Sequence, residues 1–126
     1  MVYAREDEGA TGRLIRVVTL WVHPGKTAAF ETFEREAARI MARHGGRIDL
    51  AVRLAPPDGG VGPVGAAGAW DGGPPFELHI VSFPNQAAFE ACGADSETLA
   101  LRSRREQIVA RTIVVAGRAA GPYGED

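Results

Sequence analysis

The stretch LIRVVTLWVHPGKTAAFETFEREAARIMARHGGRIDLAVRL, residues 14–54, decides the fold. Residues 14–22 are dense in β-branched and aromatic side chains and stop just before a Pro-Gly pair, which predicts a strand. Over residues 27–44 apolar side chains recur at steps of three and four, which predicts an amphipathic helix ended by the Gly-Gly pair that follows. Residues 47–54 then alternate apolar and polar side chains, as a half-buried strand does.

The second half of the chain repeats this order after a long loop. Residues 56–75 hold five prolines and seven glycines, too many for a strand or a helix. Residues 76–83 and 108–115 are strand-like, and helical patterning broken by a glycine lies between them. The expected helix caps are Asn85 and either Asp95 or Ser96.

The order β-α-β-β-α-β predicts an α+β ferredoxin-like sandwich with an antiparallel four-stranded sheet in the order 4-1-3-2. Residues 14–117 form the single expected domain, with residues 1–13 as a mobile leader and residues 118–126 as a tail. Both helices cover one face of this sheet, and the other face is mostly apolar. We therefore expect a homodimer that pairs two open sheet faces into an α/β barrel.

The composition describes an ordinary globular protein. A chain of 126 residues suits one domain, and 14 basic against 16 acidic side chains make nucleic acid a poor partner. No apolar run is long enough to cross a bilayer, so no membrane partner is expected. The single cysteine and the charged start of the chain indicate a reducing cytoplasm. The many alanines, glycines and arginines favour a GC-rich bacterial source.

Candidate chemistry lies on the two middle strands. If Arg53 faces Glu77 across a symmetric hairpin, then Asp49, Arg53, Glu77 and His79 share one face. We expect this face to look into the barrel, where His79 with Asp49 or Glu77 acts as a general base. The alternative is that Arg53 and Glu77 form only a cross-strand ion pair. The apolar residues expected on the opposite face, toward the helices, are Ile48, Leu50, Val52, Leu78 and Ile80.

Further side chains are candidates for binding a substrate. Arg53 or Arg111 can hold an enolate or carboxylate, and Trp21 and His23 from the first strand and the turn after it can join them. Trp70 is a large aromatic in a Gly/Pro-rich loop, so it is either a lid over the cavity or a hydrophobic anchor.

We expect neither a metal nor a cofactor. The three histidines are scattered, and one cysteine adds no second thiolate. A Gly-x-Gly-x-x-Gly pattern at residues 60–65 is interrupted by a proline and has no helix after it to hold a pyrophosphate.

Four short stretches in the second half carry a resemblance to known proteins. They are Phe83-Pro84-Asn85, Asp95-Ser96-Glu97, Leu99-Ala100-Leu101-Arg102 and Val114-Val115-Ala116-Gly117. With them the chain resembles the dimeric α/β-barrel superfamily over about residues 14–117, and within it small domain-of-unknown-function proteins. That superfamily includes cofactor-free antibiotic-biosynthesis monooxygenases, polyketide cyclases, muconolactone-isomerase-like enzymes and haem-degrading enzymes. The resemblance implies a cavity between the helices and the barrel sheet, but no shared catalytic motif.

Two functions of different classes follow. The first is a homodimeric small-molecule enzyme that needs no cofactor, of the monooxygenase, cyclase or isomerase type, acting on an aromatic or polyketide-like compound. The alternative is a non-catalytic ligand-binding or interaction module on the same fold. Haem handling is disfavoured, because no histidine occupies an obvious axial position.

Overall fold

A computed structural model of the chain describes residues 12–54 and 73–124. Strands and helices alternate in this part much as the sequence predicts. They are β1 (Leu14–Val22), α2 (Thr27–Arg43), β2 (Arg47–Arg53), β3 (Glu77–Phe83), α3 (Gln86–Ala94), α4 (Ser96–Ala100), α5 (Arg102–Ile108) and β4 (Val109–Gly117).

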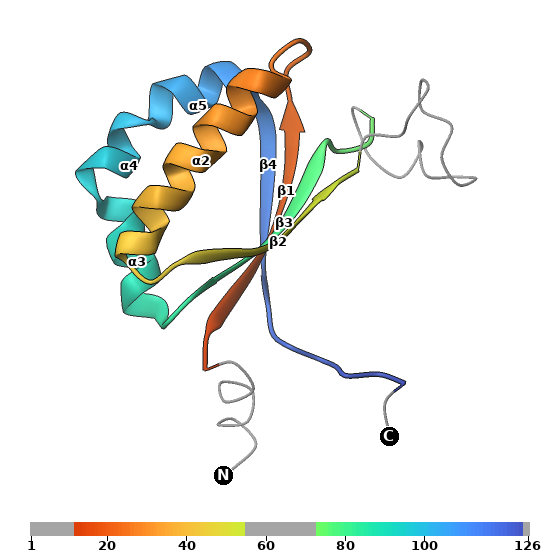
Figure 1. The fold of residues 1–126 in the computed structure, drawn as a ribbon, viewed down its shortest axis with the longest axis vertical. Coiled ribbons are helices and arrows are strands. Elements are labelled where there is room, and N and C mark those ends of the chain that lie inside the picture. Colours follow the sequence, from red (N-terminus) through yellow and green to blue (C-terminus); the bar gives the residue numbers. More distant parts are fainter. Residues whose placement is uncertain (1–11, 55–72, 125–126) are drawn as a thin grey trace.

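The strands form one antiparallel sheet in the order β2-β3-β1-β4, which is the predicted order read from the other edge. Within residues 12–54 and 73–124 all the helices lie on one side of this sheet, and none of them covers the other side, called the open face here (Figure 1). The predicted ferredoxin-like fold is therefore confirmed. No helix in the described ranges is both long and apolar enough to cross a membrane.

The open face of the sheet carries mostly apolar side chains on all four strands. Residues paired in an antiparallel sheet place their side chains on the same face. The strand registers therefore give two continuous rows on the open face, Leu50-Ile80-Val17-Val115 and Val52-Leu78-Thr19-Ile113.

The helix-facing side of β3 carries Glu77 and His79, so the predicted assignment of faces is wrong. The ring of His79 packs 6.3 Å from that of Phe30 on α2, measured between centroids, and Leu78 and Ile80 lie on the open face. Alternation puts His79 on the same side as Val81 and Phe83, which belong to the core under the helices. Once those two side chains fill the core, Glu77 and His79 must face the helices as well.

A bulge in β2 explains a second difference. The pairs Arg53–Glu77 and Ala51–His79 occur as predicted, but the register shifts between Ile48 and Leu50. Val81 therefore faces Ile48 instead of Asp49. The extra residue returns Ile48 to the helix side, where it packs against the core, whereas Leu50 and Val52 lie on the open face.

The helices seal the core against the sheet. Phe30, Phe33 and Ile40 are the buried residues of α2, at the predicted spacing. Gly45 ends this helix at φ +76°, a backbone conformation that suits glycine. A Cβ at Gly46 would overlap the Phe83 ring, so this helix end is packed directly on the sheet.

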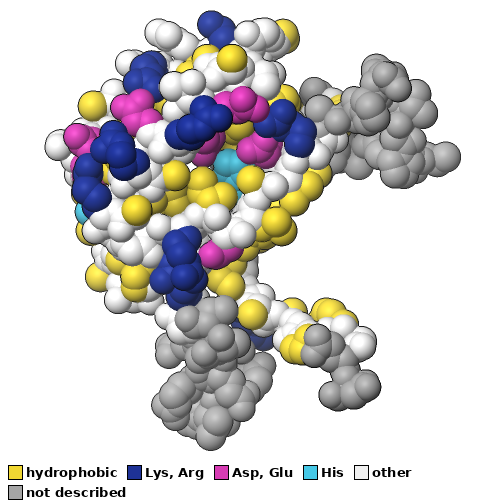
Figure 2. All heavy atoms as spheres, in the orientation of Figure 1, with side chains coloured by type: hydrophobic (Ala, Val, Ile, Leu, Met, Phe, Trp, Pro, Cys, Tyr) yellow, Lys and Arg dark blue, Asp and Glu magenta, His cyan; other side chains and the backbone are white. Residues whose placement is uncertain are grey.

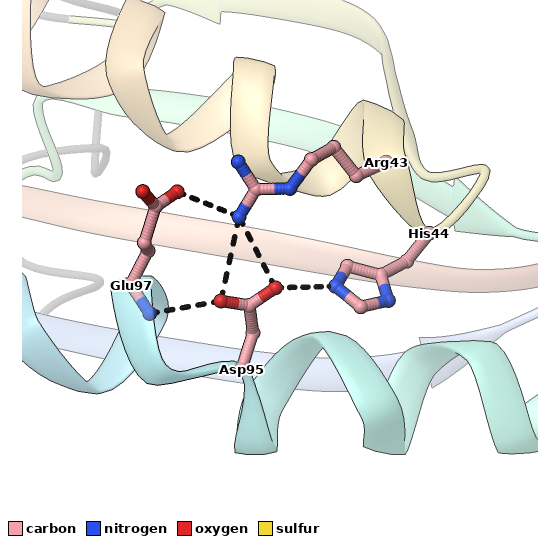
Figure 3. Close-up of polar contacts among 4 residues, drawn as sticks. All are labelled: Arg43, His44, Asp95 and Glu97. Atoms are coloured by element: carbon pink, nitrogen blue, oxygen red, sulfur yellow. Dashed lines mark hydrogen bonds and ion pairs between the residues drawn. The ribbon is translucent and has the colours of Figure 1, made fainter.

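The junction between α3 and α4 is tied to the end of α2 by one carboxylate. Asp95 accepts from the backbone N–H of Glu97, and its other oxygen lies 2.7 Å from His44 Nε2 and 3.2 Å from Arg43 Nη2 (Figure 3). Arg43 also pairs with Glu97 at 2.6 Å. The hydrogen bond from His44, together with the Glu97 N–H and Arg43, lowers the pKa of Asp95 to about 2.

We predict that Asp95→Asn removes an acid-labile part of the stability. Because the pKa of Asp95 is lowered from 3.8 to about 2 in the folded chain, its contribution is full above 3.8 and is lost as the pH falls toward 2. Denaturation midpoints should therefore fall less between these pH values for the variant than for the wild type. Asp49→Asn, at the exposed bulge, is the matched control. An equal fall in Asp95→Asn and wild type would contradict the role of Asp95.

Candidate functional site

A buried polar network lies between β3 and α2. Glu77 and His79 are only 7% and 4% exposed, although both are polar. The charged neighbours of this pair are Arg53 on β2 and Glu34 on α2. Figure 2 shows acidic and basic side chains gathered over the helical layer, with a histidine visible among them.

The hydrogen bonds define the role of each group in this network. His79 Nε2 lies 2.6 Å from Glu77 Oε2, and Arg53 Nε donates to Glu77 Oε1 at 2.6 Å. Glu77 held by an arginine is an acceptor, so we assign the Nε2 proton to His79 as the donor. The other ring nitrogen, Nδ1, then faces Glu34 Oε1 at 3.8 Å.

Arg53 closes the outer end of the network. Its Nη2 donates to Glu31 Oε2 at 3.2 Å, and its guanidinium lies 4.2 Å above the centroid of the Phe76 ring. The chain of contacts Glu31-Arg53-Glu77-His79-Glu34 therefore leads from the surface of α2 into the interior.

The inner end of the network borders a cavity of about 440 Å³ between α2 and the later helices. Its apolar wall is formed by Phe33, Ala37, Ile40, Met41, Cys92 and Leu101. Its polar wall is formed by Glu34, Thr98, Arg102, Arg105 and Glu106.

Glu34 is the titratable group that joins the network to the cavity. Its side chain is 20% exposed, and burial raises its pKa above the ordinary value, partly offset by the positive charges of His79 and Arg105. A carboxyl group in a cavity wall whose pKa is raised by burial is suited to accept and return a proton. Arg105 is fixed by its bond to Thr112 Oγ1 at 2.7 Å and supplies a positive charge beside it.

The structure brings together three of the predicted site residues, His79, Glu77 and Arg53. Asp49 lies apart, at the bulge, where its carboxylate pairs with Arg47 Nε at 3.3 Å. Cys92 lines the cavity and is buried, and burial raises the pKa of its thiol.

The remaining predicted binding residues lie elsewhere. Trp21 and Arg111 are paired on the open face, with the guanidinium 4.4 Å above the ring, and Trp21 Nε1 donates to the carbonyl of Gly73. His23 is exposed in the turn before α2. Trp70, the predicted lid or anchor, lies outside the described residues. Most of the predicted leader also lies outside them.

Sequence reasoning missed Glu34, Arg102 and Arg105. A signal for Glu34 exists, because it lies four residues after Phe30 and three before Ala37, on the inward stripe of α2. A glutamate on an apolar stripe must find a partner or a cavity. Within residues 12–54 and 73–124 no cluster of three potential ligands is arranged to hold a metal ion.

Comparison with known proteins identifies relatives in fold only. No family model matches the chain, and no curated protein sequence does. A proposed antibiotic biosynthesis monooxygenase from Bacteroides thetaiotaomicron is 13% identical, with a TM-score of 0.63 over 94% of this chain and 98% of that one. SnoaB from Streptomyces nogalater, described as a cofactor-independent oxygenase, is 17% identical, with a TM-score of 0.62 over 90% and 98%.

A protein of a third kind has the same architecture. A DABB family protein with a ferredoxin-like fold from Mesorhizobium loti is 16% identical, with a TM-score of 0.58 over 86% of this chain and 98% of that one. The chain therefore shares the ferredoxin-like fold of these proteins along most of their length.

Proposed function

We propose that this chain is a homodimeric small-molecule enzyme in which Glu34 moves a proton of an aromatic or polyketide-like substrate bound between the helices. The observation that carries the proposal is the position of Glu34, which faces the cavity on one side and His79 on the other. A cavity of about 440 Å³ with a mainly apolar wall is within the usual size for a small organic ligand.

The proposed step is a proton transfer that the chain's own residues carry out. A C–H bond beside a carbonyl, or a phenolic O–H, breaks and its proton goes to a Glu34 carboxylate oxygen. The electron pair stays on the substrate as an enolate or phenolate, and Arg105 stabilises its charge. His79, held by Glu77, stabilises the ionised form of Glu34 before the transfer, because its positive charge lowers the Glu34 pKa against the effect of burial.

Proton removal of this kind begins isomerisations, cyclisations and oxygenations alike. That SnoaB is described as a cofactor-independent oxygenase supports placing this chemistry on the fold, although 17% identity carries no residue role across. The competing function is a binding module in which the same cavity holds a ligand without reaction. The two differ in whether Glu34 moves a proton of the bound molecule.

The homodimer is proposed on the open face of the sheet. Leu50 there is 54% exposed, and the two mostly apolar rows form a surface that a second copy would cover. A dimeric ferredoxin-like protein from an uncultured marine organism has a similar fold. It is 8% identical, with a TM-score of 0.50 over 90% of this chain and 92% of that one. The network and the cavity lie on the opposite side of the sheet, so each copy would keep its own site.

Exchange of the α-protons of 2-tetralone in D₂O tests the proton transfer. We expect the wild type to accelerate exchange and Glu34→Gln to reduce that acceleration by about 100-fold, the usual contribution of a general base. Glu36→Gln is the matched control, since Glu36 pairs with Arg104 on the outside of the same helix. Exchange by Glu34→Gln at the wild-type rate would contradict the role of Glu34. A wild type no faster than buffer would favour the binding module.

Glu34 should also reduce the stability of the folded chain at neutral pH. Because its folded pKa is raised, the folded state holds this proton more tightly, and that stability is lost as the pH rises above 4.5. Urea denaturation should show Glu34→Gln gaining stability over the wild type from pH 4 to pH 8. Glu36→Gln again controls for the loss of a surface carboxylate. A difference that stays constant or shrinks with pH would show that burial does not act on Glu34.

Sedimentation equilibrium tests the dimer. The wild type should have twice the 13.4 kDa mass of the chain at micromolar concentration, and Leu50→Lys should sediment as one chain. Leu99→Lys is the control, because Leu99 is similarly exposed at 45% but lies on α4 in the helical layer. A monomeric wild type, or dimer loss in Leu99→Lys alone, would contradict pairing through the open face.

A further inference from the structure

One wall of the cavity carries a positively charged side chain that has no partner among the described residues. Arg102 lines the cavity at the first position of α5. Within residues 12–54 and 73–124, no hydrogen bond or ion pair engages its guanidinium. Arg35 and Arg39 are likewise unengaged in this part of the chain, but neither lines the cavity.

The other charged groups of the polar wall are Arg105, Glu34 and Glu106. Arg105 uses one N–H on Thr112 and keeps the rest of its five donors. Of the two carboxyl groups, Glu106 is exposed, and Glu34 Oε1 lies 3.8 Å from His79 Nδ1. Arg102 is therefore the one guanidinium group of this wall that has no partner among the described residues.

From this arrangement we propose that the cavity takes an aromatic or polyketide-like acid, whose rings pack on Phe33, Ile40 and Met41 and whose carboxylate pairs with Arg102. The inference rests on the proposed function and narrows its substrate class to compounds that carry an acidic group. Arg105 remains beside Glu34 for the charge that develops during proton transfer, whereas Arg102 holds a charge that the ligand brings with it.

A guanidinium is well matched to a carboxylate. Its planar N–H groups bind both oxygens, and such charge-assisted bonds are about twice as strong as neutral ones. An exposed arginine also loses little hydration when a ligand at the cavity mouth reaches it. We expect the carboxylate to gain about tenfold in affinity over a neutral group of the same shape.

Methionine labelling gives a direct view of the cavity. The chain has two methionines, of which Met41 lines the cavity and the other is residue 1. A sample with ¹³C-labelled methionine methyl groups therefore shows two signals, and Met41→Leu identifies the one from the cavity. The probes are 2-naphthoate, 2-naphthol and 2-naphthylmethylamine at pH 7, which share one ring system and are anionic, neutral and cationic.

The proposal predicts an order of binding and its dependence on Arg102. The Met41 signal should report naphthoate binding about tenfold tighter than naphthol and tighter still than the amine. Arg102→Gln should abolish the advantage of naphthoate without changing naphthol binding, and Arg102→Lys should restore part of it. Glu106→Gln should tighten naphthoate, because it removes a like charge. Arg39→Gln is the matched control on α2 and should change nothing.

The outcomes separate this inference from the function on which it rests. Naphthol binding as tightly as naphthoate, or naphthoate unaffected by Arg102→Gln, would overturn the acid class while leaving a ligand-binding cavity in place. A Met41 signal that none of the three probes shifts would overturn both. Since Arg102 has no partner among the described residues, its substitution is not expected to disturb folding, and the unbound methyl spectrum verifies this.

Discussion

The bond of 2.6 Å between His79 Nε2 and Glu77 Oε2 is the interaction on which the buried polar network of this molecule depends. β3 is an interior strand, and its helix-facing side is buried, so a polar side chain there must be paired. Glu77 satisfies His79 and Arg53 together, and among the described residues no buried side-chain nitrogen or oxygen lacks a partner. Removing one member of a buried ionic pair costs about 3–5 kcal/mol, which constrains substitutions at Glu77 and His79.

The polar network and the open face lie on opposite sides of the sheet. The helix face carries Glu77 and His79 and leads through Glu34 to the cavity, while the open face presents the rows that contain Leu50 and Val115. A polar cluster directed into the barrel would have made binding and dimerisation depend on the same surface. With the faces as they are, the proposed dimer interface and the proposed site can be altered separately.

The sequence predicts the elements, the strand order and the caps, because each has a local signal: the spacing of Phe30, Phe33 and Ile40, the alternation in β2, the side chain of Asn85 bonded to Ala88 N. The choice of face has no such signal. Alternation places Glu77 and His79 on one face of β3, and Leu78 and Ile80 on the other. Each face also carries apolar side chains, so alternation does not show which face meets the helices. Only the packing of Val81 and Phe83 in the core decides this. The bulge at Asp49 is not visible in the pattern either, and without it Ile48 would fall on the wrong side. Glu34 was predictable from its place on an apolar stripe, whereas its distance to His79 depends on how α2 lies across the sheet.

His79 faces the helices, and its positive charge lowers the pKa of Glu34. The pH titration of the Glu34 carboxyl carbon by ¹³C NMR tests this coupling most directly. In the wild type we expect a pKa above the ordinary value of 4.5, because burial raises it. In His79→Gln we expect that pKa to rise further, since the positive charge of His79 lowers it. A Glu34 carboxyl that titrates at its ordinary value and does not respond to His79→Gln would contradict the account.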